Sequence, residues 1–276
     1  MTRLLPWLCL APALGLLGVF TFWPMGFLVG LSLTQGSLTR RGSYWVGLAN
    51  YARLLSDPDF AQVLVNTLIY TVGTVVPAVI LPLVLAVMLN QNLPGRSLWR
   101  LLYFLPSVIS LVAAGLAFRW LFQTEGPLNQ LFHLSIPWLS QPWGARVALI
   151  VVSVWHQLGF NLVVFLAGLQ TIPLTQYEAA LLDGANAWQR FWYITLPNLR
   201  PTLVLVTVTT TLFTLRNFEP VYVMTGGGPL NRTNILVYYI YDQAFNQFDL
   251  GYAAAAAVVL FTVVLGLLLW RLKTVG

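Results

Sequence analysis

Residues 60–95 read FAQVLVNTLIYTVGTVVPAVILPLVLAVMLNQNLPG, with no Asp, Glu, Lys or Arg among them. A helix needs about 20 consecutive apolar residues to cross the hydrocarbon core of a bilayer, and this stretch exceeds that length. Further charge-free stretches occupy residues 4–39, 101–118, 147–177 and 250–270. The sequence therefore predicts an all-α membrane protein that crosses the bilayer several times.

The composition excludes an ordinary soluble domain. Hydrophobic residues make up 58% of the 276-residue chain and charged residues only 8%, whereas soluble domains carry roughly 25% charged residues. The net charge of +6 does not indicate a nucleic-acid-binding protein, because the basic residues are scattered singly along the chain. The first charge-free stretch is too long for a secretory signal, whose apolar region has about 7–15 residues, so we expect a retained span.

We predict six transmembrane helices separated by five connections. Their expected ranges are 5–33, 63–90, 99–122, 146–171, 201–224 and 249–271. The second and fourth connections then share one side of the membrane with both termini. Seven of the 14 Lys and Arg residues fall on each side, so the excess of positive charge that marks cytoplasmic loops leaves the orientation open.

The fourth connection, residues 172–200, reads IPLTQYEAALLDGANAWQRFWYITLPNLR and is too polar for a seventh span. Thr175 and Glu178 have the spacing of a capping box, which predicts a short helix from about residue 176 to 182. Gly184 suits the turn after this helix, where a positive φ is often needed.

A second short helix is expected after that turn. Asn186 would cap its start, Pro197 would end it, and Pro201 fits the first turn of the next span. Two short helices between two spans form a compact knob that suits docking into a groove of a soluble partner. The aromatic residues of the segment would also suit an interfacial helix lying on the lipid.

The spacing of residues in this loop resembles a known family. Glu178-Ala179-Ala180, three further residues, Gly184, nine further residues and Ile194-Thr195-Leu196-Pro197 resemble the EAA loop of binding-protein-dependent ABC importer permeases. Most of the remaining chain is similar to the sugar-uptake branch of that family. The similar segments are GLANYARLL (47–55), NTLIYTV (66–72), RSLWRLLYFLPSVIS (96–110), VWHQLGFNLVVFLAGLQTIP (154–173), YVMTGGGPLNRTN (222–234) and YIYDQAFNQFDLGYAAA (239–255).

The resemblance implies one permease domain, residues 1–276, with the type I ABC importer fold. It implies that the EAA loop is cytoplasmic and forms the coupling helix. Both termini are then expected on the cytoplasmic side of a prokaryotic plasma membrane. The residues expected to couple to the ATPase are Glu178, Ala179, Ala180, Asp183 and Gly184. Glu178 can serve both this contact and the capping box, and Asp183 can pair with a basic ATPase residue or cap locally.

The resemblance also implies an assembly. Its parts would be a second permease subunit, usually a different chain, two cytoplasmic ATPase subunits and an extracytoplasmic binding protein. ATP and Mg²⁺ would act on the ATPase subunits, with no cofactor in this chain and no nucleic acid among the partners. The implied function is uptake of a sugar or sugar derivative across the lipid membrane by alternating access.

Polar residues near the outer end of the fifth span are candidates for the substrate path. Charged residues within spans usually face the bundle interior or a water-filled cavity. Arg216 and Glu219 are three residues apart, so a helical ion pair and a pathway role are both open. Asn217, Glu219 and Tyr222 are predicted to line the path, because polar and aromatic groups suit the hydroxyls and apolar faces of a sugar.

Other positions carry two interpretations each. Gly226, Gly227 and Gly228 permit a close, irregular turn, which would either contact the binding protein or serve as a plain exit turn. His156 and Asn161 in the fourth span would either line the pathway or hydrogen-bond between helices.

The motifs do not indicate an enzyme. The sequence lacks the GxxxxGK[ST] loop that binds nucleotide phosphates, and its two histidines are isolated from each other, so we expect neither ATP hydrolysis nor a metal site. Two alternatives to an importer subunit are an ion-coupled secondary transporter and a non-transporting scaffold. The spans contain almost no acidic residues and no evident internal repeat, whereas many ion-coupled transporters are built from internal repeats. A scaffold would not need a coupling loop.

Overall fold

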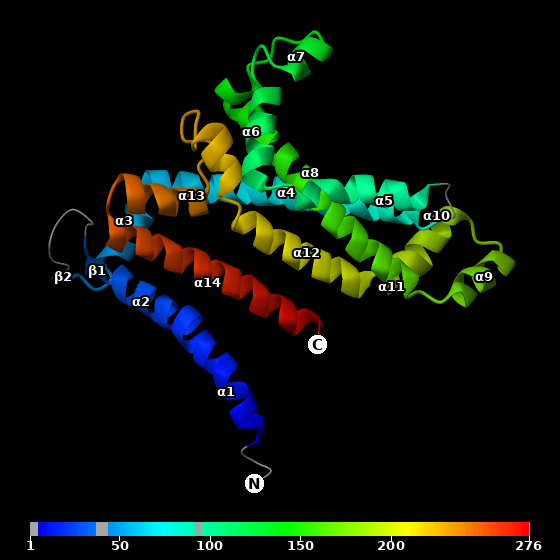
Figure 1. Cartoon of the computed structure of the whole chain (residues 1–276), viewed down its shortest axis with the longest axis horizontal. Coiled ribbons are helices and arrows are strands. Elements are labelled where there is room, and N and C mark those ends of the chain that lie inside the picture. Colours follow the sequence, from blue (N-terminus) through cyan, green and yellow to red (C-terminus); the bar gives the residue numbers. More distant parts are fainter. Residues whose placement is uncertain (1–4, 37–43, 92–94, 276) are drawn as a thin grey trace. The chain divides into compact units, whose positions relative to one another are not determined.

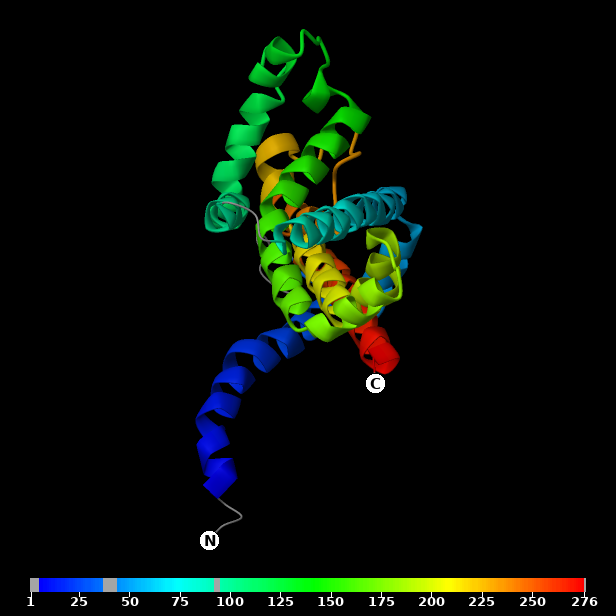
Figure 2. The ribbon, with the colours of Figure 1, turned by 90° about the vertical axis from the view of Figure 1, so that its right-hand side faces the viewer.

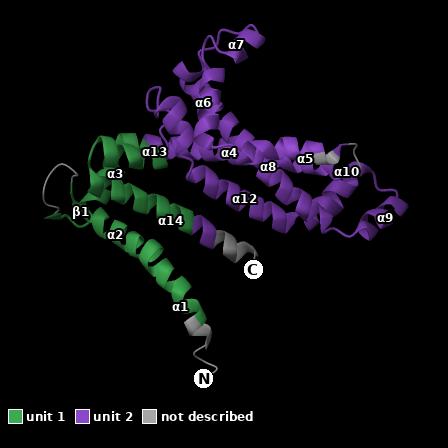
Figure 3. Cartoon of the chain, viewed as in Figure 1, with its two compact units in different colours: residues 1–61, 236–265 green, residues 62–235, 266–276 purple. Residues whose placement is uncertain are grey.

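The described part of the chain is mostly helical (Figure 1). The computed structural model describes residues 5–36, 44–91 and 95–275. Two compact units divide the chain (Figure 3): unit 1 comprises residues 1–61 and 236–265, and unit 2 comprises residues 62–235 and 266–276.

Unit 1 contains the N-terminal helical run, a small hairpin and the first part of the last helix. The first run is continuous and curved (Figure 2). Strands β1 and β2 pair antiparallel, with Thr34 opposite Trp45. The elements are α1 (Leu5–Leu17), the π-helix η1 (Gly18–Phe22), α2 (Trp23–Ser32), β1 (Thr34–Gln35), β2 (Tyr44–Trp45), α3 (Ala49–Ser56), α13 (Leu236–Tyr241), the π-helix η6 (Asp242–Asn246) and most of α14 (Leu250–Val275).

Unit 2 contains the central helices and the predicted coupling loop. Helices α8 and α12 lie side by side (Figures 1 and 2). The elements are most of α4 (Pro58–Leu89), α5 (Arg96–Phe104), the 3₁₀ helix η2 (Leu105–Val108), α6 (Leu111–Leu121), α7 (Pro127–Leu131), the 3₁₀ helix η3 (Trp138–Ser140), α8 (Pro142–Gln170), α9 (Leu174–Leu182), α10 (Ala187–Arg190), the π-helix η4 (Phe191–Thr195), α11 (Leu196–Asn198), α12 (Arg200–Leu215) and the π-helix η5 (Val221–Thr225).

Four helices among the described residues are long and apolar enough to cross a membrane. They are Cys9–Ser32, Pro58–Leu89, Pro142–Gln170 and Leu250–Leu269, and they match four of the six predicted spans. The bent pair Leu98–Val108 and Leu111–Leu121 makes a fifth if it is one span, and Arg200–Leu215 is a shorter apolar helix.

The third predicted span is bent rather than straight. Its two helices meet at 96°, and Pro106 lies in the 3₁₀ turn η2 just before the bend. Proline has no backbone N–H and clashes with the preceding turn, so a straight α-helix cannot continue through it without loss of a hydrogen bond. This segment lies very close to α8. Glycine at position 159 allows the approach, because a Cβ there would overlap the backbone of Tyr103.

The fifth predicted span, 201–224, is interrupted. Helix α12 ends at Leu215 after 16 residues, which corresponds to about 24 Å and is less than the roughly 30 Å of a hydrocarbon core. Residues 217 and 218 are not helical, and a new helical segment begins at Glu219. Pro220 explains the break, because it suits the first turn of a helix but not its interior.

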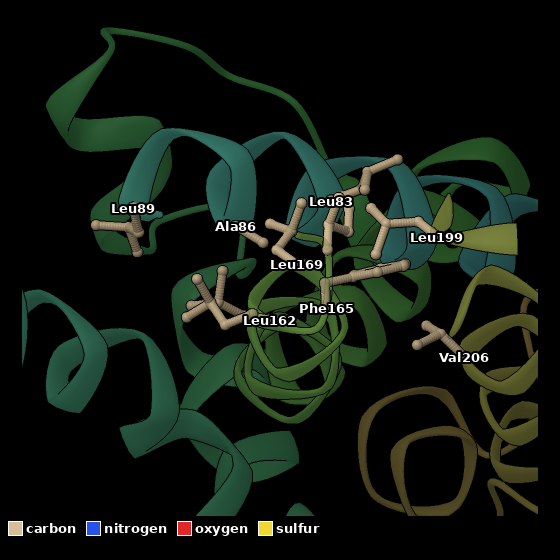
Figure 4. Packing of buried hydrophobic residues seen from close by; sticks show 10 residues of the cluster. Leu83, Ala86, Leu89, Leu162, Phe165, Leu169, Leu199 and Val206 are labelled. Atoms are coloured by element: carbon tan, nitrogen blue, oxygen red, sulfur yellow. The ribbon is translucent and has the colours of Figure 1, made fainter. Parts of the chain in front are cut away.

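A hydrophobic core in unit 2 joins α4, α8 and the start of α12 (Figure 4). Phe165 and Leu162 are fully buried at its centre. Leu199, near the end of the predicted coupling loop, belongs to the same core. The core residues are Leu83, Ala86, Leu89, Leu162, Phe165, Leu166, Leu169, Ile172, Leu199 and Val206. Residues at both ends of this loop, Ile172 and Leu199, are therefore packed against the long helices.

Candidate functional site

The short helix predicted at about residues 176–182 is present as α9 (Leu174–Leu182), and its surface is exposed. Every residue of α9 is at least partly exposed, and Leu182 at its end is 91% exposed. Glu178, Ala179 and Asp183 are also exposed. Exposed apolar residues grouped outside the spans mark interaction surfaces.

The end of α9 is shaped as predicted, but its start is not. Gly184 has a φ of 80°, the left-handed conformation that glycine adopts without strain. Thr175 and Glu178 do not form the predicted capping box. Helix α9 starts two residues earlier than expected, with Pro173 as its N-cap and no side-chain cap hydrogen bond there. Glu178 therefore remains free of that local role.

The second helix of the loop begins at its predicted cap. Asn186 accepts a hydrogen bond from the Gln189 backbone N–H at 2.9 Å, and the Gln189 side chain accepts one from the Asn186 N–H at 2.8 Å. This reciprocal capping box satisfies two backbone donors of the first turn.

Pro197 does not end the second helix, contrary to the prediction. The π-helix η4 runs into α11, which contains Pro197, and the chain continues through Leu199 into α12. In η4 the Leu196 N–H reaches back five residues to the Phe191 carbonyl, so the wider turn accommodates a proline at the next position. Pro201 lies in the first turn of α12, as predicted.

Side-chain hydrogen bonds tie α9 to this second helix. The Tyr177 and Thr195 hydroxyls lie 2.9 Å apart, and Asn198 Nδ2 donates to Gln176 Oε1 at 3.0 Å. Tyr177 also packs against the hydrophobic core. The two short helices therefore form one knob that is attached to the spans.

A polar cavity of about 350 Å³ lies at the break after α12. Two of the three predicted path residues, Asn217 and Glu219, line it. The lining residues are Leu111, His156, Gln157, Phe213, Arg216, Asn217 and Glu219. Gln157 Oε1 is buried and has no hydrogen-bond partner among the described residues. Such an acceptor favours a ligand that brings its own hydroxyl donors.

Asn217 is held in place by two helices. Its Nδ2 donates to the Tyr70 hydroxyl at 3.0 Å and to Ser153 Oγ at 3.3 Å, and these two hydroxyls lie 2.6 Å apart. Tyr70 comes from α4 and Ser153 from α8, so the non-helical residue at the break is anchored on both. Sequence reasoning did not identify Tyr70 or Ser153.

Tyr222 lies apart from the cavity lining. Its ring stacks on Phe218 with centroids 5.1 Å apart, and about half of its side chain is exposed. Arg216 and Glu219 form no ion pair among the described residues, because α12 ends at Leu215 and the helical spacing expected to join them is absent.

The two polar residues of α8 have different positions. Asn161 is buried and donates to the Ala78 carbonyl at 2.7 Å and to Thr210 Oγ1 at 3.0 Å, so it links α8 to α4 and α12. His156 lines the cavity, and its Nε2 lies 3.1 Å from the Ile109 carbonyl.

The glycine-rich turn is irregular, as expected. Gly226 and Gly227 have φ values of 56° and 81°, and a cis peptide joins Gly228 to Pro229. Only Gly226 of the three is exposed, and Gly227 is buried. The most exposed large apolar side chain of this loop is that of Leu230, at 82%.

A clasp formed by Asn66 of α4 and Arg146 of α8 holds this loop. Asn66 Nδ2 donates to the Asn231 carbonyl at 2.7 Å and to the Asn234 carbonyl at 3.0 Å. Arg146 Nε donates to the Arg232 carbonyl at 2.9 Å, and its Nη2 donates to Asn66 Oδ1 at 2.9 Å. The clasp satisfies backbone carbonyls that no helix or strand would satisfy. Sequence reasoning missed it, although a polar Asn66 inside a charge-free stretch was a signal.

Unit 1 contains a second polar network outside the predicted sites. The Tyr252 and Tyr239 hydroxyls donate to Asp57 Oδ2 at 2.6 Å and 2.9 Å. Arg53 pairs with Asp249 at 2.6 Å and lies over the Tyr252 ring. Partial burial acts to raise the pKa of the Asp57 carboxyl, but the hydrogen bonds from Tyr252 and Tyr239 outweigh burial and lower that pKa below 3.8. This network joins α3, α13 and α14.

Within the described part of the chain, no three His, Cys, Asp or Glu side chains come together to hold a metal ion. The arrangement therefore consists of an exposed knob, a polar cavity and a clasped loop on packed helices.

Comparison with known proteins identifies relatives that extend over nearly the whole chain. The lactose transport system permease protein LacF of Rhizobium radiobacter is 38% identical over 270 residues, covering 94% of this chain and 89% of that protein. The sulfoquinovosyl glycerol transport system permease protein SmoG of Agrobacterium fabrum is 39% identical over 267 residues, covering 94% of this chain and 86% of that protein.

A solved structure shows the same fold. It is a bacterial alginate ABC transporter in complex with an alginate pentasaccharide-bound periplasmic protein. One of its chains superposes with a TM-score of 0.83 and 26% identity, over 97% of this chain and 92% of that chain.

The family comparison agrees with both findings. Residues 64–275 match the model of the binding-protein-dependent transport system inner membrane component. This membership supports a transport permease subunit rather than an enzyme, and it does not support the ion-coupled carrier or the scaffold. The chain belongs to the binding-protein-dependent transport system inner membrane component family.

Proposed function

We propose that this chain is the permease subunit of an ATP-driven importer that moves a sugar or sugar derivative into the cytoplasm by alternating access. The names of the relatives support the substrate class: lactose, sulfoquinovosyl glycerol and alginate are all rich in hydroxyl groups. The polar cavity after α12 supports it as well, because its buried Gln157 acceptor suits a hydroxyl donor.

The single observation that carries the mechanism is the knob formed by α9 and the helix after it. Its outer surface is exposed, whereas Tyr177, Phe191 and Ile194 pack against the core of α4, α8 and α12. A partner that binds the outer surface and moves the knob would therefore also move the spanning helices packed against it. We assign Glu178, Ala179, Ala180, Asp183 and Gly184 to the contact with the ATPase.

The proposed topology has six spans, with both termini and the knob in the cytoplasm. The bent pair and the short helix α12 with its continuation after Glu219 would supply the third and fifth spans. The partners would be two ATPase subunits that bind ATP and Mg²⁺, a second permease subunit and an extracytoplasmic binding protein. A periplasmic protein bound to the alginate transporter supports the last of these.

The substrate path is proposed to pass the cavity, with Asn217 and Glu219 in its wall. Tyr222 remains a proposed path residue whose exposed ring would meet the sugar outside the cavity. The loop of Gly226, Gly227 and Gly228 is proposed to contact the binding protein, and exposed Leu230 is its most accessible apolar group.

The test is the ATPase activity of the complex reconstituted in nanodiscs with the subunits encoded beside it. Leu182→Asp places a charge on the exposed end of α9, and Leu131→Asp is the matched control, because Leu131 in α7 is also a largely exposed leucine. We expect loaded binding protein to stimulate the wild type and the control. We expect the Leu182 variant to lose most of this stimulation while the complex stays assembled.

An unchanged stimulation in the Leu182 variant would contradict the coupling role of α9. If assembly itself is lost, the exposed residue Glu178 is replaced by Lys instead, which reverses its charge without introducing backbone strain. Wild-type stimulation of the ATPase by loaded binding protein in the Glu178→Lys variant would also contradict the proposal.

A further inference from the structure

A second cavity, of about 300 Å³, lies between the knob and the ends of α4 and α8. It is separate from the polar cavity after α12, and the two share no lining residue. Its lining residues are Val87, Asn90, Gln91, Leu169, Leu174, Tyr177, Ala187, Arg190, Phe191 and Thr195. The proposed function leaves this cavity without a role.

The lining of this cavity includes polar side chains and one positive charge, that of Arg190. Arg190 Nε is buried and has no hydrogen-bond partner among the described residues. Asn90 and Gln91 add amide donors, and the described lining contains no Asp or Glu. A desolvated donor on a cation is unfavourable when left unpaired. An anion with several acceptor oxygens would pair it, and a guanidinium matches phosphate geometry well.

Other lining residues are apolar, among them Val87, Leu169 and Phe191. The cavity also lies where the spans α4 and α8 end, at Leu89 and Gln170. Aromatic side chains next to it are strongly exposed, Trp188 at 69% and Tyr193 at 80%. Amphipathic rings at span ends favour the headgroup level of a bilayer, so the cavity opens at the depth of lipid phosphates.

We propose that this cavity binds the phosphate of an anionic phospholipid, with Arg190 as the principal donor and Asn90 and Gln91 as further donors. Basic pockets between helices at this face of a membrane are suited to anionic headgroups. The bound lipid would fill the space between the knob and the spans and stiffen the connection between them. The cavity and its chemistry do not depend on the transport proposal, which only identifies the leaflet as the cytoplasmic one.

The experiment is native mass spectrometry of the complete complex, released from nanodiscs that contain phosphatidylglycerol and phosphatidylcholine in equal amounts. Arg190→Gln removes the cation, and Arg200→Gln is the matched control, because Arg200 is an exposed arginine on the same side. Gln91→Glu is a second variant that places an anion in the lining at an exposed position, where folding is not at risk.

We expect the wild type and the Arg200 variant to retain phosphatidylglycerol in preference to phosphatidylcholine. We expect both Arg190→Gln and Gln91→Glu to lower this retention about tenfold or more, the factor that corresponds to one hydrogen bond to a charged group. Equal retention in all four proteins would overturn the proposal.

Two other results would overturn the lipid assignment specifically. The first is that the lipid-free complex in detergent retains inorganic phosphate, that Arg190→Gln loses this retention, and that the complex shows no lipid preference. This result would assign the site to a free anion. Loss of an ATPase subunit from the Arg190 variant, with lipid retention unchanged, would assign Arg190 to a protein contact. ATPase stimulation in the Leu182 test above has no bearing on these outcomes, so the two proposals fail independently.

Discussion

Replacement of Asn66 by alanine should release the loop at residues 226–235 without unfolding the protein. Asn66 is only 2% exposed. Its Oδ1 accepts a hydrogen bond from Gln62 within α4. In the clasp, Asn66 donates to two loop carbonyls and accepts a hydrogen bond from Arg146, and alanine removes all three of these clasp interactions. At roughly 0.6–1 kcal/mol each, the loss is about 2–3 kcal/mol of the free energy that keeps the loop closed.

Hydrogen exchange followed by mass spectrometry measures this loss directly. The Arg232 and Thr233 amides donate to the Pro229 and Gly227 carbonyls within the loop, so they exchange when the loop opens. A decrease of about 2–3 kcal/mol in the free energy of opening accelerates exchange roughly 30- to 150-fold. We expect this acceleration in the peptide that covers the loop, together with weaker stimulation by the binding protein.

Asn129→Ala is the matched control. Asn129 is equally buried and also donates to two backbone carbonyls, those of Thr124 and Ile136, but it holds a different loop. We expect Asn129→Ala to accelerate exchange only in its own loop. The clasp would be refuted if it does so while the exchange rate at residues 226–235 in Asn66→Ala stays within threefold of the wild-type rate.

Three further predictions concern the packing of the chain. Phe165→Ala should lower the free energy of unfolding by about 3–5 kcal/mol, because it empties the centre of the core; a change in thermal stability no larger than that of exposed Phe245→Ala would contradict this. Gly159→Val should strongly destabilise the contact of α8 with the backbone of Tyr103, whereas Gly266→Val, with open space around it, should fold normally; equal melting temperatures would contradict the close approach. The lowered pKa of Asp57 implies stabilisation that is full above the ordinary value of about 4 and is lost as the pH falls through the lowered pKa. The melting temperature of the wild type should therefore fall more steeply than that of Asp57→Asn on acidification below pH 5, and parallel curves would disprove the role of this carboxylate.

The positions of the spanning helices could be predicted because charge-free length reflects the bilayer directly. The interruptions could not, because prolines act differently in different places. Pro77 and Pro82 lie inside the continuous helix α4, whereas Pro106 and Pro220 accompany breaks. Which proline is tolerated depends on whether neighbouring helices satisfy the freed backbone groups, and this is tertiary information.

The knob was predictable from local spacing, and the sites around the cavity were predictable only in part. Gly184 and Asn186 act within a few residues of sequence, so their roles were visible. Asn66 and Arg146 act on a loop far along the chain, and they do so through backbone carbonyls that have no sequence signature. Of the two roles left open for Arg216 and Glu219, the helical ion pair is not formed, because a spacing of three residues brings side chains together only where the helix continues.

The measurement that tests the central claim most directly is uptake of a labelled sugar by proteoliposomes that contain the complete complex. ATP and Mg²⁺ are sealed inside, and loaded binding protein is supplied outside. Candidate sugars include lactose and the other substrate types named for the relatives. We expect accumulation that requires both internal ATP and external binding protein and that is independent of an ion gradient. Accumulation driven by a proton or sodium gradient in vesicles without ATP would contradict the account.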